Sequence, residues 1–393
     1  MPLHNLQTVR RKRDPLTEDQ LKGIIAQNVT QAISFNDWLN EERTYNLQMY
    51  NTDPDAGILA EREEGWSSLV SPDTRTVIES VMPSLMRIFA SGDRVMTFAP
   101  SGEEDVEAAE QETEILSHVL MKQNDGFTNL YDWMHDALLN NNGVASIGWD
   151  ESEWVEEEPH EDLDDNAYAV LVQQIEEDED AEIIEHTLRK EETPVPPEAL
   201  PIEVVQVAAT GQIPPPTAEI TFHDVQVRRT HTEGKPRWGV IAPEEFLITP
   251  RARTIRDSAF VGHRRRVPVS ELIAEGFPRE LIDGLPLAGE YDDTLKIERH
   301  NDNFLEHTES DESMREVWRT DCYIRLDGDG DGIAELRHIV VGGENEILSN
   351  EVVEYTPYYS ITPLRQPHRW QGKSLAWLVN DIQLLRSFLL RGM

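Results

Sequence analysis

The sequence contains one cysteine, Cys322, in 393 residues. A single cysteine excludes an intrachain disulfide and any zinc site built from several thiolates, and it fits a reducing compartment. No stretch reaches the roughly 18 consecutive apolar residues that a membrane-spanning helix needs. A basic cluster stands at residues 10–13, but no apolar run follows it, as a secretory signal would require. These absences favour a soluble, intracellular protein.

Positive charge is also scarce. The chain carries 35 Lys and Arg residues against 75 Asp and Glu residues, which gives a formal net charge of −40. Sequence-specific nucleic-acid binders usually show the opposite balance. The length leaves room for two or three domains with a sizeable core.

The motifs of common enzyme classes are missing as well. There is no G-x-S-x-G, no dinucleotide-binding glycine pattern and no pair of histidines at H-x-x-x-H spacing. Gly372-Lys373-Ser374 resembles the end of a phosphate-binding loop, but Pro367 occupies the position of the first glycine. The sequence therefore favours a structural or interaction protein without an active site.

What the sequence does contain begins with helical patterns over residues 15–150. Thr17 and Gln20 have the spacing of a helix-capping box. Residues 71–89 follow with apolar side chains at helical spacing, and Pro83 inside them should kink or split that helix. A further helix should end at Asn140-Asn141-Asn142-Gly143 and lead into a strand.

Residues 151–218 differ from the rest in composition. Residues 151–198 hold 19 acidic side chains against Arg189 and Lys190, and prolines accumulate over residues 194–216. Because such a composition buries little apolar surface, we expect an insertion or flexible linker with one short helix near residues 168–175.

Strand patterns dominate from residue 219, with short helices between them. The last segment, residues 374–391, is helical with one strongly apolar face that needs a partner to cover it. The expected fold class is α+β: a helical N-terminal region, an acidic flexible insertion, a β-rich middle region with short helices, and a terminal helix.

The sharpest local signal is the D-x-D-x-D-G pattern of residues 327–332. Asp327, Asp329 and Asp331 can converge on a hard cation such as Ca²⁺, and Glu335 follows at the ninth loop position. His338 stands where an EF-hand places a bidentate glutamate. The alternative is a hairpin turn that is simply rich in Asp and Gly. A bound Ca²⁺ would be structural, and no other cofactor is indicated.

The main basic region lies between residues 251 and 266. Arg264, Arg265 and Arg266 stand together, and Arg251, Arg253 and Arg256 precede them. These side chains can contact phosphate. In a chain this acidic, pairing with carboxylates of the same chain or of a neighbouring subunit is favoured, because arginine suits ion pairs at interfaces.

Several further stretches are informative when they are taken together and in order. They are residues 65–68 and 77–89, residues 140–145, residues 243–247 and 260–264, residues 329–335, and residues 363–368, 372–376 and 381–386. As an ordered set, these stretches resemble the portal proteins of short-tailed bacteriophages.

The resemblance implies a structural subunit of a ring, usually of twelve copies, at the portal vertex of the virion, assembled in the host cytoplasm. Such a ring forms the conduit for genome packaging and ejection, docks the terminase motor and later the tail, and contacts the capsid. DNA passes through it without sequence-specific binding, no membrane is involved, and the subunit has no catalytic residues. Family members continue beyond the helix at residues 381–391, so the resemblance also implies a C-terminally truncated chain.

The resemblance also implies a role for each region of the chain. They are a basic tail (1–14), a helical wing-like region (15–150), an acidic Pro-rich insertion or linker (151–218), an α/β portal region (219–300), a β-hairpin region with the D-x-D-x-D-G turn (301–370), and the first helix of an incomplete C-terminal portion (371–393).

Two other functions stay open at this level. An acidic adaptor or scaffold would bind basic partners through residues 151–198 as a monomer, with strong salt dependence. A metal-dependent hydrolase would use Asp327, Asp329 and Asp331 in a cleft beside a group such as His338, and an exposed hairpin tip would exclude it.

Overall fold

A computed structural model describes residues 15–61, 65, 67–90, 92, 96–102, 105–178, 180–194, 217–288 and 311–392. The basic tail, the Pro-rich stretch from residue 195 to 216 and residues 289–310 lie outside the described residues. The chain divides into two compact units. The main unit comprises Met1–Gly148 and Arg237–Met393, and the acidic unit comprises Trp149–Pro236.

The order of elements confirms the α+β class. The helices are α1 (Glu18–Asn51), α2 (Asp73–Ala90), α3 (Val106–His118), α4 (Gly126–Asn140), α5 (Asp165–Glu177), α7 (Val269–Ala274), α8 (Arg279–Asp283) and α10 (Leu375–Arg391). The strands are β1 (Gly143–Leu163), β2 (Ala181–Pro194), β3 (Thr217–Ile241), β4 (Phe246–Ile248), β5 (Phe260–Pro268), β6 (Glu316–Leu326), β7 (Glu335–Gly342), β8 (Glu346–Val352) and β9 (Tyr358–Ile361). Among the described residues, no helix is both long enough and apolar enough to cross a membrane.

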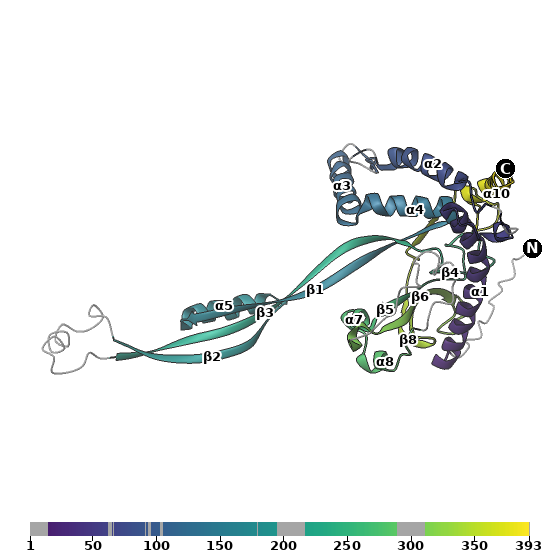
Figure 1. Ribbon diagram of the computed structural model, residues 1–393. Coiled ribbons are helices and arrows are strands. Elements are labelled where there is room, and N and C mark those ends of the chain that lie inside the picture. Colours follow the sequence, from purple (N-terminus) through teal and green to yellow (C-terminus); the bar gives the residue numbers. More distant parts are fainter. Residues whose placement is uncertain are drawn as a thin grey trace, which may run out of the picture. The chain divides into compact units, whose positions relative to one another are not determined.

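A five-stranded antiparallel sheet, in the order β4-β5-β6-β7-β8, forms the centre of the main unit. Helix α1 runs along it (Figure 1). The helix begins at the predicted capping box, in which the Thr17 hydroxyl accepts from the Gln20 N–H and the Gln20 side chain accepts from the Thr17 N–H. Leu21 and Ile25 then pack against the sheet residues Phe260 and Ile339, all of them buried.

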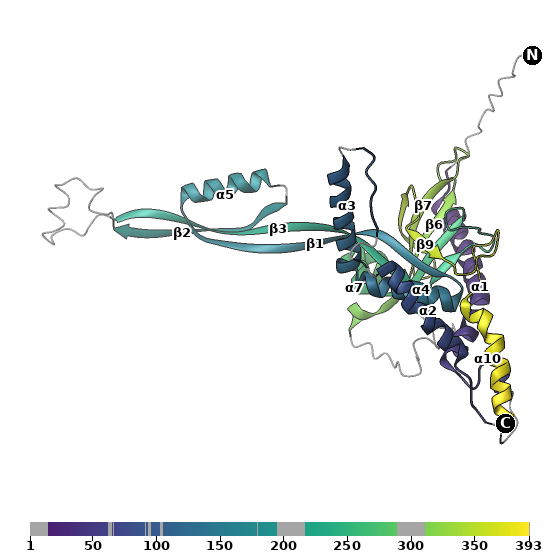
Figure 2. The same cartoon turned by 90° about the horizontal axis from the view of Figure 1, so that it is seen from above.

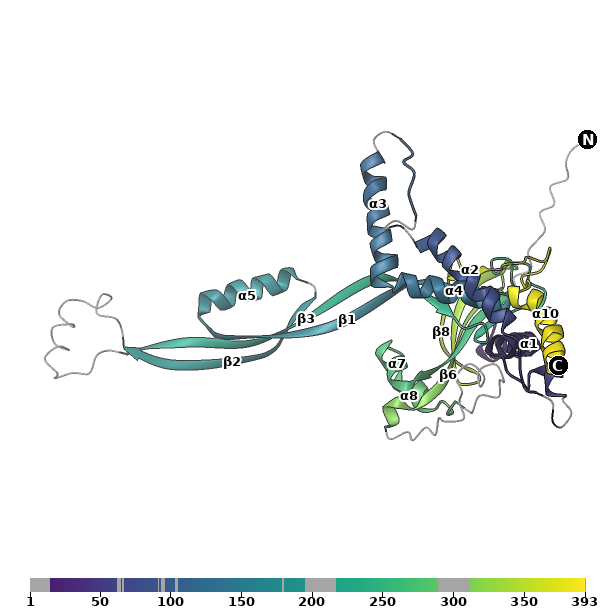
Figure 3. The ribbon, with the colours of Figure 1, turned by 45° about the horizontal axis from the view of Figure 1, so that its top comes forward.

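Two short helices close one end of this sheet (Figure 3). Leu272 of α7 and Ile282 of α8 are fully buried against Val267 and Val317 of β5 and β6. Gly276 ends this helical turn with a φ of +87°, a backbone conformation that favours glycine.

Helices α2, α4 and α10 share a third hydrophobic cluster. Its buried members include Ile78 and Met82 of α2, Leu130 and Met134 of α4, and Ala376 of α10. Helix α2 continues through Pro83, so the proline does not split it.

Helix α10 packs on the rest of the main unit through its polar face. Its buried residues include Asn380, Gln383 and Ser387, whereas Ile382, Leu385 and Leu389 are each more than 60% exposed. The apolar face that the sequence displays so strongly therefore points away from the unit's core.

The acidic unit is built on long β strands with one helix. Strand β3 pairs antiparallel with β2, and β1 flanks β3 on its other side. Helix α5 runs along these strands, as Figure 2 shows. Its Tyr168 ring stacks on the rings of His186 and His223, with centroids 4.7 and 4.2 Å away.

Composition predicted a mobile insertion with a short helix. The structure has that helix and, in addition, strands on both sides of it. Cross-strand ion pairs explain how so acidic a segment can form a sheet. Arg228 on the middle strand reaches Glu157 and Glu182 on its two neighbours. Arg229 likewise lies near Glu158 and Asp178.

Candidate functional site

The D-x-D-x-D-G segment forms the turn between β6 and β7. The Asp327 carboxylate accepts hydrogen bonds from the backbone N–H groups of Gly330 and Gly332, at 2.8 and 2.9 Å. Gly330 and Gly332 have φ angles of +78° and +88°, which the tight turn requires and glycine adopts without strain. Asp329 and Asp331 accept from N–H groups two residues ahead. The turn is therefore folded by its own side chains.

This fold brings three of the four predicted ligands together. One carboxylate oxygen each from Asp327, Asp329 and Asp331 lies within 4.8 Å of the others. Glu335 is directed elsewhere, because its carboxylate accepts a hydrogen bond of 3.0 Å from Arg337. The three oxygens have the chemistry that a hard divalent cation prefers.

The same geometry argues against a hydrolase active site built from these three carboxylates. Asp329 is exposed at the hairpin turn, and Asp327 and Asp331 are partly exposed. His338, the suggested neighbour, instead stacks on Tyr323 at 4.5 Å and lies 3.6 Å from Asp321.

The second predicted cluster, the arginines of residues 251–266, divides into two groups. Arg265 and Arg266 pair within the chain, with Glu271 at 2.6 Å and with Glu316 at 3.7 Å. The Arg264 guanidinium lies over the Trp318 ring, 4.6 Å from its centroid, and burial lowers its pKa. For Arg265 and Arg266 the structure provides the intrachain carboxylates that the sequence favoured, whereas Arg264 contacts an aromatic ring.

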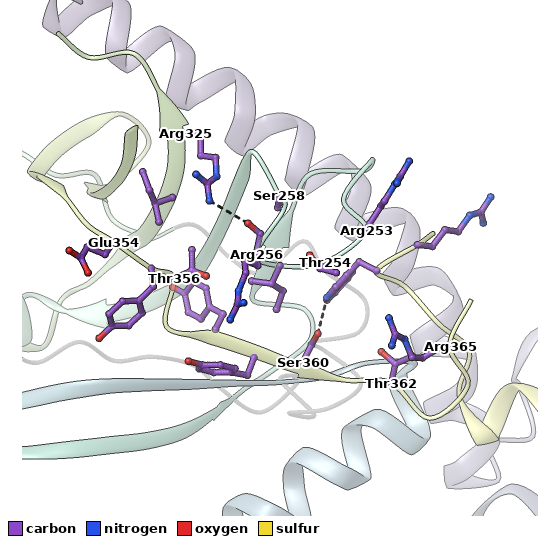
Figure 4. A pocket seen from close by; sticks show the side chains of 17 residues that line it. Arg253, Thr254, Arg256, Ser258, Arg325, Glu354, Thr356, Ser360, Thr362 and Arg365 are labelled. Atoms are coloured by element: carbon purple, nitrogen blue, oxygen red, sulfur yellow. Dashed lines mark hydrogen bonds between the residues drawn. The ribbon is translucent and has the colours of Figure 1, made fainter. Parts of the chain in front are cut away.

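Arg253 and Arg256 instead line a cavity of about 820 Å³ in the main unit (Figure 4). Three further arginines line it, from the end of β6 and from the loop before α10: Arg325, Arg365 and Arg369. Glu354 is the single carboxylate in this lining. A hydrogen bond of 3.1 Å from the Trp370 Nε1–H to the Ser360 hydroxyl fixes the cavity wall.

A second cavity, of about 470 Å³, continues this surface. It shares Arg253, Arg369 and Trp370 with the first, and it adds Arg251 and the exposed Trp38 ring of α1. We call the surface formed by the two cavities the arginine surface. Sequence reasoning singled out Arg251, Arg253 and Arg256 but missed the other three, because only the fold brings residues 325, 365 and 369 to the same place.

Comparison with known protein families decides what kind of protein carries these features. A family model described as "Phage SU10 portal protein" matches residues 21–393. The chain belongs to the phage SU10 portal protein family. Comparison with curated proteins gave no match.

Membership in this family implies a role at the portal vertex of the virion, in an oligomeric ring with capsid and packaging partners. Portal proteins are structural and non-enzymatic, in agreement with the sequence-based prediction.

Proposed function

We propose that the chain is the subunit of a twelve-membered portal ring of a short-tailed phage, through which the genome is packaged and ejected. The ring assembles in the host cytoplasm and docks first the terminase motor and then the tail. The match of the portal family over residues 21–393 carries this proposal.

The charge of the chain supports the conduit role. DNA that must slide through a channel is retarded by cationic side chains that bind its phosphates. A formal charge of −40 per subunit provides an electronegative environment in which such contacts are few. The same charge makes the copies repel one another, so assembly needs specific contacts that offset it.

The regional roles follow the same proposal. Residues 15–150 form a helical wing-like region, residues 219–300 the α/β portal region and residues 301–370 the hairpin region. Residues 151–218 are an insertion, and the compact unit Trp149–Pro236, which includes these residues, supports a separate region there.

The particle mass in solution tests the proposal. Twelve copies of the 44.9 kDa chain make a closed ring of about 540 kDa. We expect light scattering after size exclusion to give this mass and electron micrographs to show rings with a central hole. A monomer at all protein and salt concentrations, with salt-sensitive binding to basic proteins, would instead identify an acidic adaptor.

We further propose that a structural Ca²⁺ binds Asp327, Asp329 and Asp331. The convergence of their oxygens supports this proposal. We expect 2 mM Ca²⁺ to raise the melting temperature of the chain, and Asp329→Asn to abolish the increase. The matched control is Asp257→Asn, at an exposed position outside the turn. An equal increase in wild type and Asp329→Asn would contradict the site.

A further inference from the structure

The arginine surface stands out because, within the described residues, the five arginines of its larger cavity have no carboxylate partner; the Arg325 guanidinium donates only to the Arg256 carbonyl. Arg253, Arg256, Arg325, Arg365 and Arg369 line one cavity with a single carboxylate. None of the five forms an ion pair in the part of the chain that the structure describes, although the chain has more than two acidic residues for every basic one. Elsewhere, Arg319 is held by Glu275 at 2.6 Å and Arg265 by Glu271 at the same distance. The surface is therefore a local excess of positive charge on an acidic protein.

The aromatic side chains of this surface indicate a protein as its partner. Tyr355 is 70% exposed, Tyr359 46% and Trp38 55%, although large aromatic rings are usually covered. Arginine, tyrosine and tryptophan are the residues most enriched at the energetic centres of protein interfaces. Beneath them Tyr358 and Trp370 are buried and packed against Phe246, so the floor of the cavity is rigid.

The complementary charge lies in the acidic unit of the same chain. Residues 149–236 contain 24 acidic and five basic residues, a net charge of −19. Several of these carboxylates are exposed and form no ion pair within the described residues, among them Glu161, Asp180 and Glu185. Glu161 and Glu185 lie on β1 and β2, and Asp180 directly precedes β2.

We infer that the arginine surface is a docking site for the carboxylates of the acidic unit of a second copy of the chain. The inference rests on the proposed ring, in which each copy has neighbours. Guanidinium groups bind carboxylates through paired, charge-assisted hydrogen bonds, and the tyrosine and threonine hydroxyls of the lining can accept or donate at its rim. Each docked acidic unit removes part of the repulsion that a ring of −40 subunits otherwise carries.

A nucleic acid is the less suitable occupant. Its phosphates meet the same overall negative potential of the subunit as the carboxylates of the acidic unit do, so charge alone does not favour them. An acidic segment of a second copy already belongs to the assembly, so its local concentration at the surface is high.

Assembly provides the first test. The double variant Arg253→Glu/Arg256→Glu reverses two charges of the surface. The matched control Arg87→Glu/Arg279→Glu makes the same change in net charge at exposed positions of α2 and α8. We expect the surface variant to lower the fraction of rings at least tenfold and the control to assemble like wild type.

A charge swap completes this test. Adding Glu161→Arg/Glu185→Arg to the surface variant should restore rings. The inference would be overturned if the surface variant assembled as well as the control, or if the added Glu→Arg substitutions did not restore rings. Rings formed by the wild type would still support the proposed function.

A binding measurement tests the surface without relying on rings. Fluorescence anisotropy compares labelled poly-L-glutamate with a single-stranded 20-mer DNA, at protein concentrations below assembly. We expect wild type and control to bind poly-L-glutamate and the surface variant to bind it at least tenfold more weakly. Tighter binding of the DNA, lost in the same variant, would overturn the inference in favour of a nucleic-acid contact. No binding of either probe would also overturn it, whether or not rings form.

Discussion

At the scale of single residues, Asp321 shows how the central sheet tolerates a charge that is largely withdrawn from solvent. Its carboxylate lies 3.0 Å from Arg319 and 3.6 Å from His338, and Arg319 is also held by Glu275. Burial alone would raise the pKa of Asp321, but the contact with His338 and the charge of Arg319 lower it to about 2. The network therefore stabilises the ionised carboxylate.

The pH dependence of stability follows from this shift. Because the pKa in the folded state lies below the roughly 3.9 of an unfolded chain, the carboxylate stabilises the fold by about 2 kcal/mol above pH 5. This contribution is lost as the pH falls from about 4 to 2. We expect Asp321→Asn to lower the free energy of unfolding by about 2–4 kcal/mol at pH 7, since it leaves Arg319 less compensated.

Urea unfolding between pH 7 and pH 2 measures this effect. The variant should lose less stability than wild type over the acid range, and the exposed control Glu280→Gln should follow wild type. A variant as stable as wild type at pH 7 would contradict the role assigned to Asp321.

The neighbouring Cys322 of β6 is fully buried. Burial and the charge of Asp321 raise the pKa of its thiol. Since the thiolate is the reactive form, we expect Cys322 in the native chain to react with Ellman's reagent at pH 8 at least 100 times more slowly than in the urea-unfolded chain. Similar rates in the two states would show that β6 opens readily.

At the scale of elements, α10 reverses the usual relation between hydropathy and burial. Gln383 is fully buried, where its side chain accepts from the Thr74 N–H and donates to the Met49 carbonyl, each at 2.7 Å. Asn380 donates to Asn46 and accepts from the Thr74 hydroxyl. These hydrogen bonds connect α10 to both α1 and α2.

Truncating a side chain on the buried polar face of α10 should lower the free energy of unfolding more than truncating one on its exposed apolar face. Gln383→Ala leaves the buried Thr74 N–H without its partner and removes one hydrogen bond from the Met49 carbonyl, which keeps the bond from the Thr52 N–H. We expect the variant to lower the free energy of unfolding by about 2–4 kcal/mol. Leu385→Ala removes a side chain that is 63% exposed and should change it by less than about 1 kcal/mol. Urea unfolding of the unassembled chain compares the two, and a larger loss for Leu385→Ala would contradict the orientation of the helix.

The elements also differ in how far they could be predicted from the sequence. Local signals sufficed for the capping box of α1, the end of α4 at Asn140 and the position of α5, because each depends on neighbouring residues. The buried face of α10 could not be predicted, since its partners Asn46 and Thr74 are about 300 residues away in sequence. The arginine surface was predicted only in part for the same reason: its six arginines come from three separate stretches of the chain.

At the scale of the whole molecule, the main unit has a complete core of its own. Within the described residues, five hydrophobic clusters are found, and all their members lie outside residues 149–236. Strands β1 and β3, which carry the chain into and out of the acidic unit, are hydrogen-bonded neighbours. A short connection can therefore join their ends.

We expect the main unit to fold when residues 149–236 are replaced by a short Gly/Ser linker. The shortened chain should unfold cooperatively, with a melting temperature within about 5 °C of wild type, as calorimetry can show. A second shortened chain that also carries Phe246→Ala, a change in the core, should melt well below the first. Loss of cooperative unfolding in the first chain would mean that the acidic unit is needed for folding.

The reversed burial of α10 also changes what a mutational map of the unassembled chain should look like. Polar positions 380, 383 and 387 should tolerate almost no substitution, because hydrogen bonds demand particular atoms at fixed places. Leucine and isoleucine positions 382, 385 and 389 should accept most residues, polar ones included. Substitutions chosen from hydropathy alone would therefore target positions 382, 385 and 389, which the fold of the single chain does not require, and would spare the polar positions that it does require.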